Sequence, residues 1–199
     1  SVEKCSNEEE RNHFLHLMSE ETVHMKRLID DMLLLANSDA DTLTIKPEAC
    51  QPDLLLLDTY EKFEPLAKKN GLHLILALPE EILPDCFCDI HRTEQIFSII
   101  VDNALCYTPS GGKVTLSCHA ENEMLCFLFE DTGCGISEEK KSHIFERFYR
   151  ADDAHTDREH FGLGLCIAKE LTEKQNGNIQ VVDAPISGSC FMVQLPCAL

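Results

Sequence analysis

Asp131-Thr132-Gly133-Cys134-Gly135-Ile136 follows directly after an apolar segment, residues 124–130, that has the pattern of a strand. A carboxylate at the end of a strand, followed by two glycines, lets the backbone approach a flat ligand closely. Alone, the pattern D-x-G-x-G fits a tight turn equally well. The segments on either side therefore decide between a ligand site and a simple turn.

Two neighbouring segments favour a ligand site. Downstream, Phe161-Gly162-Leu163-Gly164-Leu165 is a glycine loop that runs into a predicted helix, a geometry that aims free N–H groups at an anion such as phosphate. The alternative is a hinge or a helix-packing glycine. Upstream, Asn103 lies within a predicted helix whose other face is apolar, and a poor helix former in that position needs a hydrogen-bonding reason.

Helices and strands mix along the rest of the chain. The patterns predict helices over 8–37, 52–70, 91–107 and 164–175, and strands over 42–46, 72–78, 86–89, 113–120, 124–130, 178–183 and 189–195. The loops around 131–143 and 149–163 are too long for simple connections, which indicates a functional role.

The first helix carries a bundle seam, in which apolar residues recur at spacings of three, four and seven. The helix cannot bury this stripe by itself, so it needs a partner. The seam consists of Phe14, Met18, Met25, Leu28, Met32 and Leu35. The polar run 38–41 ends the helix and predicts a boundary between residues 1–40 and residues 41–199.

Composition excludes some classes of function. The 35 acidic and 17 basic residues give a net charge of −18, which argues against nucleic-acid binding. The 11 cysteines lie mostly in apolar stretches and are odd in number, so we expect a cytosolic chain without a disulfide framework. A metal site at Cys86 and Cys88, with His91 nearby, is not favoured because no second pair stands at zinc spacing. No apolar run reaches the roughly 18–20 residues that cross a bilayer, so we expect no membrane contact.

In order and spacing, these motifs resemble the N, G1, F and G2 boxes of sensor histidine kinases, which are members of the GHKL ATPase superfamily. The N box is QIFSIIVDNALCYTP at 95–109, the G1 box is 131–136, the F box is IFERFYR at 144–150 and the G2 box is 162–165. Residues 188–191 resemble the last strand of the family. Residues 25–33 resemble the second helix of its dimerisation and phosphotransfer domain.

The resemblance implies an α+β fold, a two-layer α/β sandwich with a mixed sheet backed by helices on one face and an N-terminal bundle helix. It implies ATP and Mg²⁺ as ligands, autophosphorylation of a histidine on an upstream helix, and transfer to the receiver domain of a response regulator. The full protein would be a homodimer through that bundle and a membrane-anchored receptor, with this chain in its cytoplasmic portion. The acceptor histidine would lie upstream of Ser1, since His16 and His24 fall on the second helix.

Roles of single residues also follow from the resemblance. Asp131 would accept a hydrogen bond from the adenine amino group, supported by Ser189 through ordered water, and Asn103 would ligate Mg²⁺. Residues 149–161 would form a lid. The remaining expected contacts are Gly133 and Gly135 in the G1 box, Tyr107 and Ile136 at the base and sugar, Gly162, Leu163, Gly164 and Leu165 at the triphosphate, and Arg147 or Arg150 paired with it.

Departures from the family pattern leave a second function open. Ile99 stands where the family usually has Asn, Cys106 where it has Lys or Arg, and Glu159 and His160 where it has glycines. Losing one charge-assisted contact costs about 1.5–3 kcal/mol. The alternative is therefore a nucleotide-binding sensor or scaffold with weak or absent kinase activity. An anti-sigma serine kinase is disfavoured by the seam helix, and a P-loop enzyme by residues 111–114, which read as a turn.

Overall fold

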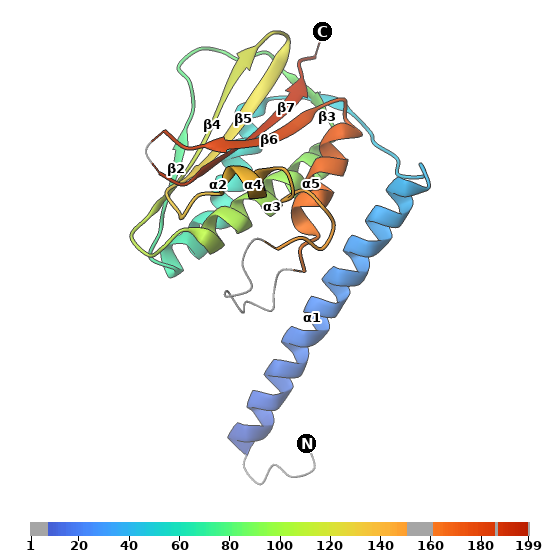
Figure 1. The fold of residues 1–199 in the computed structure, drawn as a ribbon, viewed down its shortest axis with the longest axis vertical. Helices are drawn as coiled ribbons and strands as arrows, with labels where there is room; N and C mark the ends of the chain where they lie inside the picture. The colour runs from blue at the N-terminus through green and yellow to red at the C-terminus, as the bar shows by residue number, and fades with distance from the viewer. Residues whose placement is uncertain (1–7, 151–160, 186, 199) are drawn as a thin grey trace.

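The computed structural model of the protein describes residues 8–150, 161–185 and 187–198 (Figure 1). The helices are α1 (Glu8–Asp39), α2 (Pro52–Lys69), α3 (Ile90–Tyr107), α4 (Glu138–Lys141) and α5 (Gly164–Glu173). The strands are β1 (Glu48–Cys50), β2 (His73–Ala77), β3 (Cys86–Cys88), β4 (Lys113–Glu121), β5 (Met124–Asp131), β6 (Asn178–Asp183) and β7 (Ser189–Pro196).

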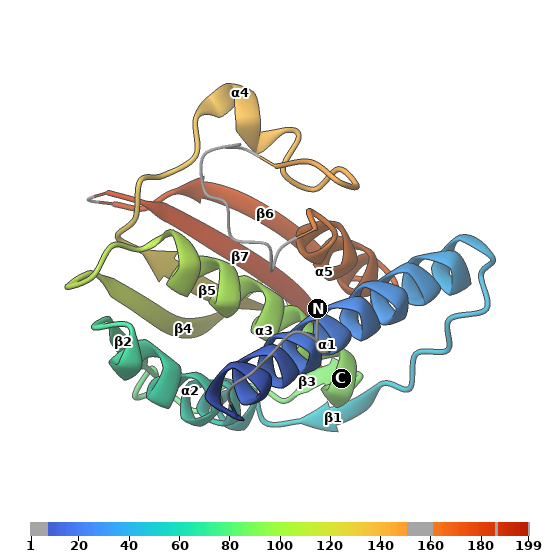
Figure 2. The ribbon, with the colours of Figure 1, turned by 90° about the horizontal axis from the view of Figure 1, so that it is seen from below.

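Five strands form one mixed sheet in the order β2-β4-β5-β7-β6. The pair β2–β4 is parallel, and the pairs β4–β5, β5–β7 and β6–β7 are antiparallel. Helices α2, α3 and α5 lie together on one face of this sheet (Figures 1 and 2). The expected two-layer α+β sandwich is confirmed.

The core lies between α3 and the middle of the sheet. The ring of Phe97 on α3 packs against the rings of Phe127 and Phe129 on β5, at centroid distances of 4.8 and 4.9 Å. All three side chains are fully buried. Because side chains alternate along a strand, Asp131 at the end of β5 shares the face of Phe127 and Phe129. The carboxylate of the G1 box is thereby directed to the helix layer.

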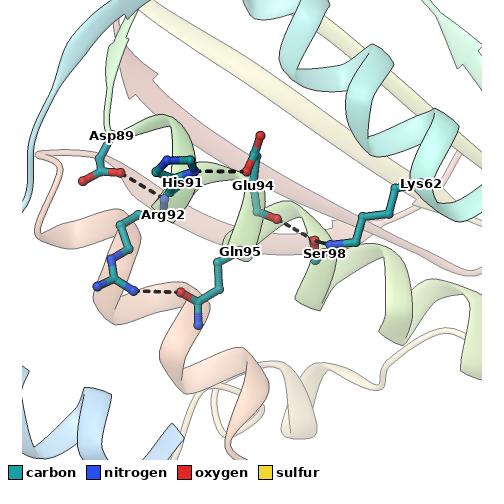
Figure 3. A network of polar contacts seen from close by, with 7 residues as sticks. All are labelled: Lys62, Asp89, His91, Arg92, Glu94, Gln95 and Ser98. Atoms are coloured by element: carbon teal, nitrogen blue, oxygen red, sulfur yellow. Dashed lines mark hydrogen bonds and ion pairs between the residues drawn. The ribbon is translucent and has the colours of Figure 1, made fainter. Parts of the chain in front are cut away.

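Asp89 is the N-cap residue of α3 and is largely buried. The Asp89 carboxylate accepts a hydrogen bond from the backbone N–H of Arg92 at 3.1 Å, as N-cap residues do (Figure 3). Its second oxygen accepts from the backbone N–H of Lys46 at 2.9 Å. The cap therefore fixes both the start of α3 and the chain segment that enters the domain.

The first strand lies later than the sequence predicted. We expected a strand over 42–46, but β1 is Glu48–Cys50, which pairs antiparallel with β3 in a separate two-stranded sheet. A strand needs a partner for its backbone hydrogen bonds, and β3 offers one only to residues 48–50. Pairing, which the local pattern cannot reveal, decides the position.

Helix α1 extends away from the sandwich (Figure 1). Near its end Leu34 and Leu35 are buried in the core, whereas Met18 and Met25 farther up the seam are 55% and 62% exposed. The helix ends at Asp39, and Asp41 takes a positive φ of 53°. Among the described residues, no helix is long and apolar enough to cross a membrane.

The two long loops differ in what is described. The loop after β5 contains the short helix α4, which the sequence did not predict. Most of the expected lid, residues 151–160 within 149–161, lies outside the described residues, together with Glu159 and His160.

Candidate functional site

A cavity of about 570 Å³ lies between α3, the loop after β5 and the segment that leads into α5. This volume is in the range of small-molecule sites, about 300–1,000 Å³. Most of the predicted site residues line it: Asn103, Tyr107, Asp131, Gly135, Ile136, Arg150, Gly162, Leu163, Gly164, Leu165 and Ser189. Predicted residues as far apart in the sequence as Asn103 and Ser189 thus meet at one site.

Asp131 provides a buried carboxylate in the wall of this cavity, with only 5% of its surface exposed. One of its oxygens accepts the backbone N–H of Gly133 at 2.7 Å. Burial raises the pKa of Asp131, and the backbone N–H groups of Gly133 and Ser189 oppose that shift. A buried acceptor of this kind favours a ligand that donates a hydrogen bond to it.

Gly133 does not line the cavity but holds its wall in place. A Cβ at residue 133 would lie 2.5 Å from the carbonyl oxygen of Tyr107 and 2.8 Å from Oδ1 of Asp131. No side chain fits there, so glycine is needed for the loop to pack against the end of α3. This contact keeps Asp131 and Tyr107 on adjacent parts of the wall.

Another part of the cavity wall is the glycine loop that leads into α5. Gly162 has a φ of +72°, and a Cβ there would lie 2.8 Å from the carbonyl carbon of Phe148. Helix α5 begins at Gly164, and its N-cap residue, Leu163, makes no side-chain capping hydrogen bond. The first N–H groups of the helix are therefore available to an anion beside the lining glycines.

One face of α3 joins these two ends of the cavity. Ile99, Asn103 and Tyr107 recur at a spacing of four, and all three line the cavity. A Cβ at residue 164 would lie 3.2 Å from Cγ2 of Ile99, so Ile99 stands against the glycine loop. Asn103 lies one turn farther, between that loop and Tyr107.

Arg147 is the second predicted residue that does not line this cavity. Its guanidinium pairs with the carboxylate of Asp39 at the end of α1, with N–O distances of 2.8 and 2.6 Å. Arg150, by contrast, does line the cavity. A contact of Arg147 with phosphate stays a prediction and requires the pair with Asp39 to open.

The lining residues that sequence reasoning missed include three charged side chains, Lys62 on α2 and Arg27 and Asp31 on α1. Nζ of Lys62 donates to Oγ of Ser98 at 2.9 Å, which holds the ammonium group beside α3 (Figure 3). The absence of a basic residue at Cys106 was the one available signal, because it prompts a search for a cation on another element.

These residues fit a nucleotide. The buried carboxylate of Asp131 suits an amino group of a base, and the close packing of Gly133 against Tyr107 holds that carboxylate in the wall. The N-terminus of α5, with Arg150 and Lys62 on the same cavity, suits phosphate groups. Ile136 adds an apolar side chain to the lining, as is usual in sites that bind small ligands.

Comparison with known families agrees with this geometry. Residues 88–199 match the family described as histidine kinase-, DNA gyrase B-, and HSP90-like ATPase. The adaptive-response sensory kinase SasA of Rippkaea orientalis is 34% identical over 173 residues, which are 86% of this chain and 44% of that protein. The sensor protein SrrB of Staphylococcus aureus is 32% identical over 185 residues, 92% of this chain and 31% of that protein. The chain thus spans less than half the length of these relatives.

Solved structures show the same fold. Full-length ShkA in complex with AMPPNP has a TM-score of 0.85 at 26% identity, and the match covers 99% of this chain and 41% of that one. The Acinetobacter baumannii histidine kinase AdeS has a TM-score of 0.74 at 23% identity, covering 94% of this chain and 84% of that one. The match over residues 88–199 and the relatives above 30% identity show the family. The chain belongs to the histidine kinase-, DNA gyrase B- and HSP90-like ATPase family, as an ATP-binding catalytic domain of the sensor histidine kinase type.

Proposed function

We propose that ATP binds in the 570 Å³ cavity, with its adenine amino group on Asp131 and its phosphates at the N-terminus of α5. One observation carries the proposal: a buried carboxylate and the N-terminal end of a helix, where Leu163 makes no side-chain capping hydrogen bond, line the same cavity. Tyr107 and Ile136 line the space between them, and Ser189 supports Asp131 through its backbone N–H.

Asn103 is the residue that would hold Mg²⁺. Its amide oxygen is a hard ligand of the kind Mg²⁺ takes, and it lines the cavity between the glycine loop and the base end. When bound, the ion neutralises charge on the phosphate oxygens. Asn103 would hold the ion in place. Gly162 and Gly164 would leave room for the phosphates, and Arg150 lines the same cavity.

In the longer protein, we infer that the catalytic domain, residues 41–199, phosphorylates a histidine on a helix preceding α1. Residues 1–40 would be the second helix of the dimerisation and phosphotransfer domain. This inference rests on the exposed apolar seam of α1, which needs partner helices. The phosphate would then pass to a response-regulator receiver domain. We further propose a homodimer formed through this bundle, in the cytoplasmic part of a membrane-anchored receptor.

A second candidate is a nucleotide-binding sensor or scaffold with weak kinase activity. Ile99 favours it, because this apolar side chain packs against Gly164, where a polar residue would reach the phosphates. Lys62 favours the kinase instead, because it places a cation on the same cavity that Cys106 does not provide.

Asp131→Asn tests the base pocket. The amide keeps the size of the side chain but sets a donor against the adenine amino group, so ATP and ADP affinity should both fall, at a cost of about 1–3 kcal/mol. Isothermal titration calorimetry with both nucleotides measures this. Unchanged affinity for both would rule out the pocket. Autophosphorylation of the full-length protein then separates the kinase from the sensor.

A further inference from the structure

Three cysteine side chains converge on the side of the domain formed by the small sheet. Cys50 ends β1, and Cys86 and Cys88 lie on β3. In the antiparallel register Cys50 is opposite Cys86, and alternation along β3 places Cys88 on the same face as Cys86. The three Sγ atoms all lie within 4.8 Å of one another, and those of Cys50 and Cys88 are 3.4 Å apart.

The three sulfur atoms are close enough to bind one metal ion after small side-chain shifts. A zinc–thiolate bond of about 2.3 Å places two thiolates of the same ion roughly 3.8–4 Å apart. Cys86 and Cys88 are fully buried, whereas Cys50 is only partly buried and leaves a path for an ion. Two buried ligands and one at the edge give three protein ligands with a fourth position open to solvent.

The three cysteines are also in contact with one another. Sγ of Cys50 lies 3.4 Å from Sγ of Cys88 and 3.6 Å from the carbonyl oxygen of Cys86. Metal ligation needs deprotonated sulfur, so binding would release protons and would weaken at low pH. The net charge of −18 also favours cations over anions at the surface.

His91, the residue that the sequence placed beside Cys86 and Cys88, is not part of the group. Its Nδ1 lies 3.6 Å from the carboxylate of Glu94, and its side chain is 93% exposed (Figure 3). Cys50, 36 positions before Cys86, takes its place. No local pattern joins these two segments, because only the pairing of β1 with β3 brings them together.

We propose that Cys50, Cys86 and Cys88 bind a thiophilic metal ion, Zn²⁺ in the first instance, through three thiolates. The ion would fasten β1 to β3. Because Asp89 follows Cys88, caps α3 and accepts the backbone N–H of Lys46, the same clamp would fix the segment that joins α1 to the catalytic domain. The site lies apart from the nucleotide cavity, whose lining contains none of the three cysteines.

Cobalt(II) is the probe of choice, because thiolate ligation gives it a charge-transfer absorption that zinc lacks. The reduced, metal-free chain is titrated with Co²⁺ under anaerobic conditions, and Zn²⁺ is then added. We expect one equivalent to bind with a sulfur-to-cobalt band, which Zn²⁺ abolishes. Cys50→Ser and Cys88→Ser should each weaken binding and remove about one third of the band intensity per cobalt bound, as loss of one of three thiolates requires.

Two variants serve as controls. Cys118→Ser removes a buried cysteine of β4 outside the group, and His119→Ala removes a member of the other candidate group, His119, Glu121 and Cys126. Both should keep the full band. Circular dichroism shows whether each variant folds. If Cys88→Ser does not fold, Cys50→Ser alone tests the proposal, because Cys50 is the partly exposed member of the group.

Thermal unfolding gives an independent readout. A metal that binds only the folded chain raises the melting temperature, so Zn²⁺ should stabilise the native chain and not Cys50→Ser. The proposal is overturned by the absence of a charge-transfer band, or by a band or a zinc-dependent shift that survives Cys50→Ser. A Cys50–Cys88 disulfide in the aerobic protein, without cobalt binding after reduction, would also overturn it and assign the group to redox chemistry.

Discussion

At the scale of single residues, Asp131 is the proposed contact of the base, and its burial has a consequence for folding. Its pKa is raised above the ordinary 3.8 mainly by burial, so the folded chain binds this proton more readily than the unfolded chain. The contribution of Asp131 to stability is therefore full below the unfolded pKa and is lost as pH rises through the folded pKa. At neutral pH the buried charge is a cost to folding.

Replacement by asparagine removes that cost. In urea unfolding across acid to neutral pH, Asp131→Asn should gain stability relative to the native chain as pH rises through this window. At pH 7 it should be at least as stable as the native chain, although it binds nucleotide more weakly. If the stability of the variant relative to the native chain instead falls as pH rises, the hydrogen bonds from Gly133 and Ser189 outweigh desolvation of the carboxylate.

Residues differ in how far the sequence could predict them. Asp131 and Gly162 belong to short patterns whose chemistry is local, so their position on the cavity was predictable. Arg147 was placed at the phosphates, but it pairs with Asp39, which lies 108 positions earlier. Lys62 and Cys50 were missed for the same reason, because their neighbours come from other elements. Contacts between distant segments depend on the sheet and helix arrangement, which no local pattern contains.

At the scale of elements, α3 presents Asn103, the proposed Mg²⁺ ligand, and the apolar Ile99 on one face. Ile99→Asn would place an amide one turn before Asn103, beside Gly164. If the native chain is limited by the missing contact, autophosphorylation of the full-length protein should rise roughly tenfold or more, as a charge-assisted hydrogen bond of about 1.5–3 kcal/mol allows. Nucleotide affinity should change little. A native rate that the substitution does not improve would assign the missing contact to Lys62 or another group.

Elements were more predictable than their pairing. The apolar alternation of β4, β5, β6 and β7 and the periodicity of α2 and α3 gave these elements nearly their observed bounds. The strand expected over 42–46 was wrong, because β1 forms only where β3 can pair with it. Helix α4 was missed because one short turn leaves no periodic signal.

Two ion pairs connect the end of α1 with the catalytic domain, and one of them holds a predicted phosphate ligand. Asp39→Asn should release Arg147 from its pair and raise ATP affinity severalfold, with a smaller effect on ADP, which lacks the third phosphate. The stability of the domain should barely change, because the pair is exposed. Calorimetric titration with both nucleotides measures the difference.

Asp41→Asn is the matched control. Asp41 lies two residues after the end of α1 and pairs with Lys174 at 2.6 Å, but Lys174 does not line the cavity. It should leave both affinities unchanged. Equal effects of the two variants would mean that charge in general, rather than release of Arg147, changes nucleotide binding.

At the scale of the whole molecule, α1 and the sandwich should behave as separable parts. A chain that begins at Asp41 keeps the sheet and its helices but loses Leu34 and Leu35, which are buried in the core. We expect one cooperative unfolding transition, destabilised by about 3–6 kcal/mol, or about 1.5–3 kcal/mol for each buried leucine. Because this deletion also removes Arg27 and Asp31 from the cavity wall, the test of Arg147 rests on Asp39→Asn. Failure of the shortened chain to fold would place the domain boundary before residue 41.

The order of strands in the sheet has a consequence for biosynthesis. Strand β7, the last along the chain, lies between β5 and β6 with side chains buried along its length. Until residues 189–196 leave the ribosome, β5 and β6 each present an unpaired edge, and such edges invite pairing with other chains. The sandwich therefore closes only after translation of β7. Nascent or prematurely ended chains that lack it depend on chaperones to escape aggregation.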